Sequence, residues 1–115
     1  MKTFQATDNY NKIKYDFKFS EGKLVKIAVS KLHSKAPAVE AYANPAKGQN
    51  AISKALFSKA MSVVCTDPVF VDYKGFLEQL NKDSMFKEDA KTIIAGYIRS
   101  MAIKINRMAL ALEEA

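Results

Sequence analysis

The sequence contains only one cysteine and one histidine, Cys65 and His33, in 115 residues. A single thiol cannot form an internal disulfide, which argues against a disulfide-built secreted scaffold. One histidine and one cysteine also cannot supply the four ligands of a closed zinc site. Cys65 falls on an apolar helical stripe, where cysteine usually packs as a small hydrophobic residue, and no motif joins it to His33. We therefore predict no metal, no cofactor and no catalytic Cys65–His33 pair, and we expect that the protein is not an enzyme.

Long apolar runs and glycine-rich loops are absent as well. No stretch approaches the length of a membrane-spanning helix, and residues 1–12 contain no apolar core of a signal peptide. The surroundings of Gly48 do not match a phosphate-binding loop. These absences predict a protein that makes no membrane contact and resides in the cytoplasm.

Positive charge is abundant but unevenly distributed. The chain has a formal net charge of +6, from 18 lysine and arginine residues against 12 aspartate and glutamate residues. Residues 1–35 contain eight lysines and three acidic residues, a net charge of +5, whereas the rest of the chain nets +1. A polyanion-binding surface is therefore expected in the first third of the chain.

The clearest secondary-structure signal lies in the same third. Residues 13–19 alternate apolar and polar side chains without a fault, which predicts a β-strand with one apolar face. A turn at residues 20–22 and a second strand over residues 23–32 complete a predicted antiparallel hairpin. Residues 1–7 are a candidate third strand, because two strands alone are only marginally stable.

The register of the hairpin follows from keeping its apolar residues on one face. A three-residue turn with Gly22 in the left-handed conformation achieves this separation, whereas a plain two-residue turn mixes the faces. The three-residue turn places Phe17 opposite Val25 and Asp16 opposite Lys26. We therefore predict this register.

The middle of the chain predicts a connector followed by a central helix. Residues 33–47 contain two prolines, so we expect an irregular connector that Val39 and Tyr42 hold against the core. Residues 51–65 repeat apolar side chains at helical spacing, around more than half of the helix circumference. A helix this apolar is expected at the centre of the fold.

Two helix starts are ambiguous in the sequence. The central helix can begin at the Asn44–Pro45 pair, with proline in the first helical position, or at residues 49–50. The next segment is either a helix over residues 68–81, or a short strand at residues 69–71 with a helix that starts after Asp72.

The C-terminal residues 84–115 predict one long amphipathic helix. Apolar side chains recur there at steps of three and four residues, and no proline interrupts them. At about 1.5 Å per residue the helix is about 45 Å long, which exceeds the dimensions of a compact core of this size. Its final turns are therefore a candidate interface, formed by Ile105, Met108, Leu110 and Leu112.

These patterns together predict an α+β fold in one domain. An N-terminal antiparallel hairpin of two or three strands packs on two or three helices, of which the C-terminal one is long. Within the domain over residues 1–115, the basic hairpin region covers residues 1–35 and the helical region covers residues 45–115.

The hairpin also presents the strongest candidate for a functional surface. In a strand, alternate residues point to opposite faces, so aromatic residues in the core leave a lysine-rich outer face. Such a face suits phosphate contacts without sequence readout, although a merely solvated face has the same composition. We predict a small binding protein that contacts nucleic acid or a nucleoprotein complex through Lys12, Lys14, Lys18, Lys26, Lys23 and Lys31.

Two other functions fit the sequence. The protein can be a protein–protein inhibitor or adaptor, for example a phage-encoded protein that acts on a host defence or a host enzyme. It can also be a structural homodimer that associates through the C-terminal helix. Both alternatives place the contact at the end of that helix rather than on the hairpin.

Overall fold

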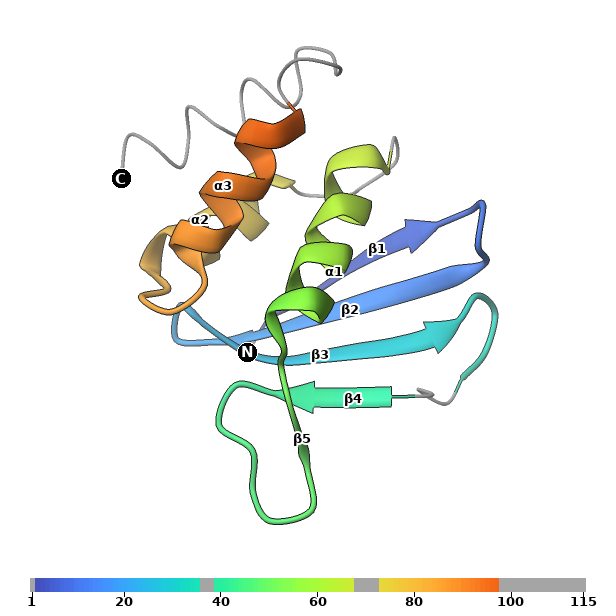
Figure 1. Cartoon of the computed structure of the whole chain (residues 1–115), viewed down its shortest axis with the longest axis horizontal. Helices are drawn as coiled ribbons and strands as arrows, with labels where there is room; N and C mark the ends of the chain where they lie inside the picture. Colours follow the sequence, from blue (N-terminus) through green and yellow to red (C-terminus); the bar gives the residue numbers. More distant parts are fainter. Residues whose placement is uncertain (1, 36–38, 68–72, 98–115) are drawn as a thin grey trace.

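The computed structural model describes residues 2–35, 39–67 and 73–97, which form one five-stranded sheet and three helices (Figure 1). The strands follow the sheet order β1-β2-β3-β4-β5, and every neighbouring pair is antiparallel except the parallel pair β4–β5. The predicted α+β fold is confirmed, and the candidate third strand is β1. The strands are β1 Lys2–Asp8, β2 Ile13–Ser20, β3 Lys23–Lys31, β4 Val39–Tyr42 and β5 Asn50–Ala51; the helices are α1 Lys54–Thr66, α2 Tyr73–Lys82 and α3 Lys87–Tyr97.

The β2–β3 hairpin differs from the predicted register. Its turn has two residues, Glu21 and Gly22, with φ values of 52° and 76°, as in the hairpin turns that match the twist of antiparallel strands. A bulge at Val25 then shifts the register by one residue, so that Lys18 pairs with Lys26. The prediction of Asp16 opposite Lys26 is therefore wrong. The bulge restores the separation of faces that a two-residue turn alone would lose.

Helix α2 packs against the hairpin turn at Gly22. A Cβ atom on Gly22 would lie 2.6 Å from the Cβ of Lys82, well inside contact distance. Glycine is therefore required here for two reasons, because its φ is positive and because α2 leaves no room for a side chain.

The helices cover one face of the sheet, and Phe76 of α2 lies at the centre of the contact. Its ring meets the rings of Phe4, Phe17 and Phe19 edge to face, at centroid distances of 5.4, 5.0 and 5.6 Å. These four rings are buried, with exposed fractions of 7% or less. The aromatic residues at alternate positions of the hairpin are thus core residues, as the strand pattern predicts.

Helix α1 begins later than either predicted start. The Ser53 hydroxyl accepts a hydrogen bond from the Leu56 amide at 3.0 Å and caps the helix. The residues just before the cap belong to the sheet, because Ala51 pairs with Tyr42 and the Ile52 amide donates to the Tyr42 carbonyl at 2.9 Å. The chain therefore becomes helical only at Lys54.

The connector after β3 contains strand β4, and its contacts differ from the prediction. Val39 is 48% exposed, and Tyr42 lies on the face of the sheet away from the helices, opposite Lys26. Ala41, between them, is the buried residue that faces the core. A four-residue strand between two prolines, Pro37 and Pro45, gives too short an alternation for the sequence to reveal it.

Helix α2 starts at Tyr73, which agrees with the second of the two predictions, a helix that begins after Asp72. The short strand that this prediction includes, residues 69–71, lies outside the described residues. Helix α3 starts at Lys87, and the Asp83 carboxylate orders the turn before it by accepting hydrogen bonds from the Met85 and Phe86 amides at 2.7 and 2.6 Å. The same buried carboxylate accepts from the Leu24 amide at 2.7 Å and so joins this helix start to β3.

The description of α3 ends at Tyr97. The remainder of the predicted long helix lies outside the described residues, together with the four predicted interface residues Ile105, Met108, Leu110 and Leu112.

Candidate functional site

The face of the sheet opposite the helices, called the open face below, is lined mainly by polar and charged side chains. Alternate residues of β1 to β4 point to it, since their neighbours in each strand point into the core. Its members are Thr3, Gln5, Thr7, Lys14, Asp16, Lys18, Lys26, Ala28, Ser30, Glu40 and Tyr42.

Strand register arranges these side chains in three rows that run across the strands. The Tyr42 row contains Thr3, Lys18, Lys26 and Tyr42; the Glu40 row contains Gln5, Asp16, Ala28 and Glu40; the Ser30 row contains Thr7, Lys14 and Ser30. Successive rows are two residues, or about 7 Å, apart along each strand. A row with two carboxylates therefore lies between two rows with lysines.

The lysines of both outer rows surround a shallow hollow of about 220 Å³, called the lysine hollow below. Ala28 and Ser30 are only 6% and 4% exposed on this face, which is consistent with cover from the alkyl stems of the neighbouring lysines. Among the described residues, the Ser30 hydroxyl makes no hydrogen bond. The hollow is lined by Thr3, Lys14, Asp16, Lys18, Lys26, Ala28, Ser30 and Lys35.

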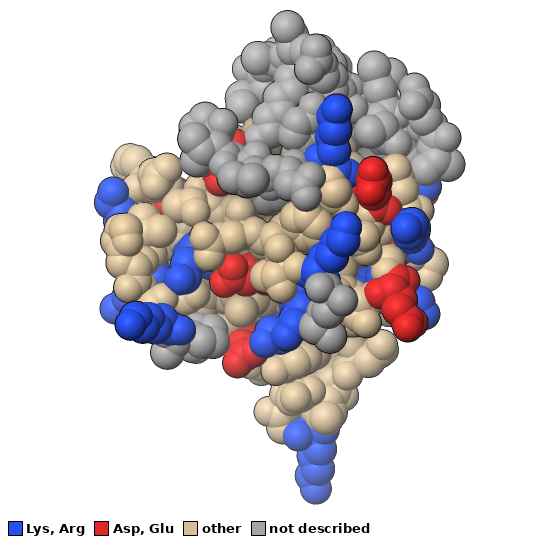
Figure 2. Space-filling model, turned by 180° about the vertical axis from the view of Figure 1, so that it is seen from behind, with Lys and Arg blue, Asp and Glu red and all other residues tan. Residues whose placement is uncertain are grey.

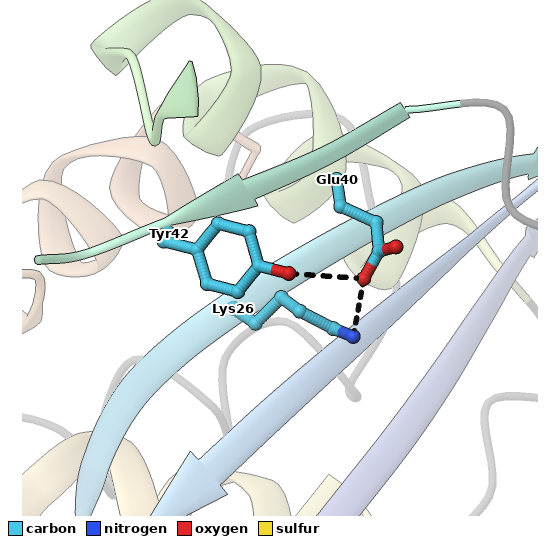
Figure 3. Close-up of polar contacts among 3 residues, drawn as sticks. All are labelled: Lys26, Glu40 and Tyr42. Carbon is cyan, nitrogen blue, oxygen red and sulfur yellow. Dashed lines mark hydrogen bonds and ion pairs between the residues drawn. The ribbon is translucent and has the colours of Figure 1, made fainter. Parts of the chain in front are cut away.

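Lys26 is the most strongly held of these lysines. Its Nζ lies 2.5 Å from Oε2 of Glu40, and the Tyr42 hydroxyl donates to the same oxygen at 3.3 Å (Figure 3). The hydrogen bond from Lys26 lowers the pKa of Glu40, and the same bond raises the pKa of Lys26. The Lys26 ammonium also lies 5.9 Å from the centroid of the Tyr42 ring. Both charges of this pair are thus stabilised in their ionised forms.

Two other charged groups of the open face have fixed partners. Lys14 Nζ donates to the Ser34 carbonyl at 2.8 Å, and Gln5 Nε2 donates to Oδ1 of Asp16 at 3.1 Å. The Ser34 carbonyl is neutral, so this bond places no opposite charge beside Lys14. Lys18 makes no ion pair or hydrogen bond within the described part of the chain. Lys14 and Lys18 are therefore the lysines of the two outer rows that are not neutralised by a carboxylate.

The structure brings together three of the six predicted phosphate-binding lysines, namely Lys14, Lys18 and Lys26 around the lysine hollow. Lys12 lies in the β1–β2 turn with a positive φ of 58°, and Lys23 and Lys31 lie at opposite ends of β3. These three are exposed and contribute to the general positive charge rather than to the hollow.

Sequence reasoning missed Lys35, Glu40 and Tyr42. Lys35 follows β3 in a proline-containing segment, and the other two belong to β4, so no strand pattern assigned them to this face. The only available signal was the alternation of Glu40, Ala41 and Tyr42, which is too short to distinguish a strand from a loop.

Tyr10 is a further exposed aromatic residue, 92% exposed in the β1–β2 turn. Asp8 orders this turn, because its carboxylate accepts hydrogen bonds from the Tyr10 and Asn11 amides at 3.1 and 3.0 Å. The bonds from Asn11 lower the pKa of Asp8. Tyr10 is thus held at the end of the sheet and outside the three rows.

Seen from the side opposite to Figure 1, the surface carries lysines separated by acidic residues rather than one continuous basic patch (Figure 2). Within residues 2–35, 39–67 and 73–97, no group of three or more potential metal-ligating side chains comes together. None of the described helices has the length and apolar character needed to cross a membrane. No protein-family model, curated protein or solved structure matches the chain.

Proposed function

We propose that the protein binds nucleic acid, alone or within a nucleoprotein complex, through the open face of its sheet. The observation that carries the proposal is the convergence of Lys14, Lys18, Lys26 and Lys35 on one hollow. Ammonium groups at this density attract phosphates, and the Ser30 hydroxyl, which lines the hollow, adds a neutral donor. The contacts are to phosphate oxygens, so we expect little sequence preference.

The two carboxylates of the Glu40 row shape this surface without removing its positive charge. Asp16 accepts a hydrogen bond from Gln5, and Glu40 is paired with Lys26. The unneutralised charges of Lys14 and Lys18 lie on either side of the carboxylates, about 13 Å apart along β2. Phosphates are therefore expected over the outer rows.

The proposal predicts a measurable salt dependence. With three or four lysines engaged, the logarithm of the association constant should fall linearly with the logarithm of salt concentration, with a slope of about −2 to −4. Fluorescence anisotropy of a labelled oligonucleotide between about 50 and 200 mM salt measures it. Absence of binding at about 50 mM salt contradicts the proposal.

Charge reversal locates the surface. Lys14→Glu and Lys18→Glu should each weaken binding about tenfold or more at low salt, because each replaces an attraction by a repulsion. Lys47→Glu is the matched control, since Lys47 is an exposed lysine in the loop between β4 and β5, away from the hollow. Equal losses in all three variants would mean that net charge, and not the open face, accounts for the binding.

The alternation of basic and acidic rows favours a second candidate, a protein partner with complementary charges of both signs. A protein–protein inhibitor or adaptor would use such a surface. Capture from lysate with and without nuclease separates the two functions. A stoichiometric protein that stays bound after nuclease and high salt supports this second candidate, whereas loss of all captured material on nuclease treatment supports nucleic acid.

A further inference from the structure

We propose that the nucleic acid bound by the open face is single-stranded, with its backbone along the Tyr42 row and a base stacked on the Tyr42 ring. This inference rests on the proposed function and adds the form of the ligand and its path. Two independent features of the face lead to it, namely the width of the basic row and the placement of the only aromatic ring among the three rows.

The Tyr42 row is wide enough for one phosphate chain. Lys18 and Lys26 are direct neighbours across β2 and β3, and the next row along the strands contains Asp16 and Glu40, about 7 Å away. A duplex carries two phosphate chains and one charge per about 1.7 Å of its axis. The Glu40 carboxylate reaches back to Lys26, so a single strand along the row would meet this one carboxylate, already paired with a lysine. The second phosphate chain of a duplex would also come close to Asp16 in the neighbouring row.

The Tyr42 ring is positioned to receive a base. It lies in the same row as Lys18 and Lys26, half-buried, and its hydroxyl is tied to Glu40 at 3.3 Å. Figure 3 shows the ring beside the stem of Lys26, with its broad side toward the viewer. A ring held in this way gives up little conformational freedom when a base stacks on it. Bases are available for stacking in a single strand, whereas in a duplex they are already stacked on one another.

The length of the row sets the size of the site. Three inter-strand spacings separate Thr3 from Tyr42, or about 14 Å, which suits a segment of a few nucleotides. Within the row, phosphates would contact Lys18 and Lys26, and one base would lie at the β4 end of the row. Lys14 and Lys35, on the other side of the hollow, would contact phosphates outside this segment. Lys26 would then exchange part of its bond with Glu40 for a phosphate oxygen.

The test compares four labelled ligands at one salt concentration: a 12-nucleotide oligo(dT), the equivalent oligo(U), a 12-base-pair duplex and polyphosphate. We expect tighter binding of both single strands than of the duplex, and the ratio of the oligo(dT) and oligo(U) affinities reports the combined effect of the 2′-hydroxyl and the thymine methyl group. Tyr42→Ala should weaken single-strand binding by about 5- to 150-fold and leave polyphosphate binding unchanged, because polyphosphate has no bases. Tyr42→Phe keeps the ring but loses its bond to Glu40, and it should weaken single-strand binding much less than Tyr42→Ala.

Tyr10→Ala is the matched control, because Tyr10 is a fully exposed tyrosine outside the row. It should change none of the four affinities. The inference is overturned if the duplex binds as tightly as the single strands, if Tyr42→Ala weakens polyphosphate equally, or if Tyr10→Ala causes the larger loss. Failure of the proposed function is distinct, since none of the four ligands would then bind. Thermal unfolding of each variant verifies that the fold is retained.

Discussion

At the scale of single residues, Glu40 determines how much of the charge on Lys26 is available to a ligand. Three groups act on its carboxylate: the ammonium of Lys26 on β3, the hydroxyl of Tyr42 on the same strand β4, and the charge of Lys18 on β2. All three favour its ionised form. Lys26 is therefore the least available lysine of the hollow, although it lies closest to Tyr42.

Removing this carboxylate charge should strengthen polyanion binding. Glu40→Gln frees Lys26 and should raise the affinity for an oligonucleotide by about fivefold at low salt, as expected for one unit charge a few ångströms from a phosphate. Anisotropy titrations of the two proteins measure the change. Glu78→Gln, in an exposed position on α2, is the control, and an equal gain there would indicate a net-charge effect only.

The Lys26–Glu40 ion pair also makes the effect of Glu40→Gln on the affinity depend on pH. The pKa of Glu40 is lowered from 4.5 and that of Lys26 is raised from 10.5, so the ion pair stabilises the fold between these ordinary values. Its contribution is lost as the pH falls through the lowered pKa of Glu40, when the carboxylate is protonated. The difference in affinity between the wild type and Glu40→Gln should therefore shrink below pH 4.5 and persist at pH 7.

At the scale of elements, the turn of the β2–β3 hairpin packs directly against helix α2. Gly22 has a positive φ and almost no space above it, whereas Gly48 has a positive φ of 85° and nothing within 4 Å of an added Cβ. Both glycines therefore have a positive φ that disfavours other residues, but only Gly22 also lacks space for a side chain.

Comparison of alanine variants at Gly22 and Gly48 measures how much the contact between the hairpin turn and α2 adds to the cost of a side chain. Gly48→Ala should cost about 1 kcal/mol from backbone strain alone. Gly22→Ala should cost about 2–4 kcal/mol, because the new Cβ must also displace Lys82 or shift the helix. Urea denaturation followed by circular dichroism gives both free energies of unfolding. Similar losses for the two variants would show that α2 yields to the added methyl group without cost.

The hairpin also shows how far the sequence determines the fold. Alternation alone assigns Phe17 and Lys18 to opposite faces, and that assignment is confirmed. It does not determine which residues face each other, because a shift of two residues keeps every side chain on its face. The observed register puts two like charges, Lys18 and Lys26, side by side, and it is Glu40 from β4 that accompanies them.

The candidate site is predictable from the sequence only in part for the same reason. The lysines on β2 and β3 follow from strand periodicity, which is a local property. Glu40 and Tyr42 belong to a four-residue strand whose existence depends on pairing with β3, a contact between distant parts of the chain. The pairing of β4 with β3 therefore determines which side chains accompany the lysines on the open face. The alternation within β2 and β3 predicts only the lysines themselves.

At the scale of the whole molecule, Cys65 reports on cooperativity. Its side chain is 1% exposed, on the buried face of α1 among residues of the common core. The thiol should therefore react only when that core opens. The core contains residues from the sheet and from all three helices, so we expect one unfolding transition.

The measurement follows thiol modification across a denaturant series. The midpoint for Cys65 labelling should coincide with the midpoint for loss of helical circular dichroism. If labelling becomes complete at denaturant concentrations where the circular dichroism is still native, α1 opens on its own and the domain is not one cooperative unit.

The bulge at Val25 has a consequence for how this hairpin can change length. The two-residue turn and the one-residue bulge each invert the phase of the alternation, and together they cancel, much as two compensating frameshifts restore a reading frame. Loss of Val25 alone would exchange inward and outward side chains along one arm of the hairpin. A second single-residue change in the turn would restore them. Insertions and deletions in this hairpin should therefore be tolerated in pairs. In a library of length variants, folded proteins should be those with an even total number of inserted and deleted residues, and variants with an odd number should fail to fold.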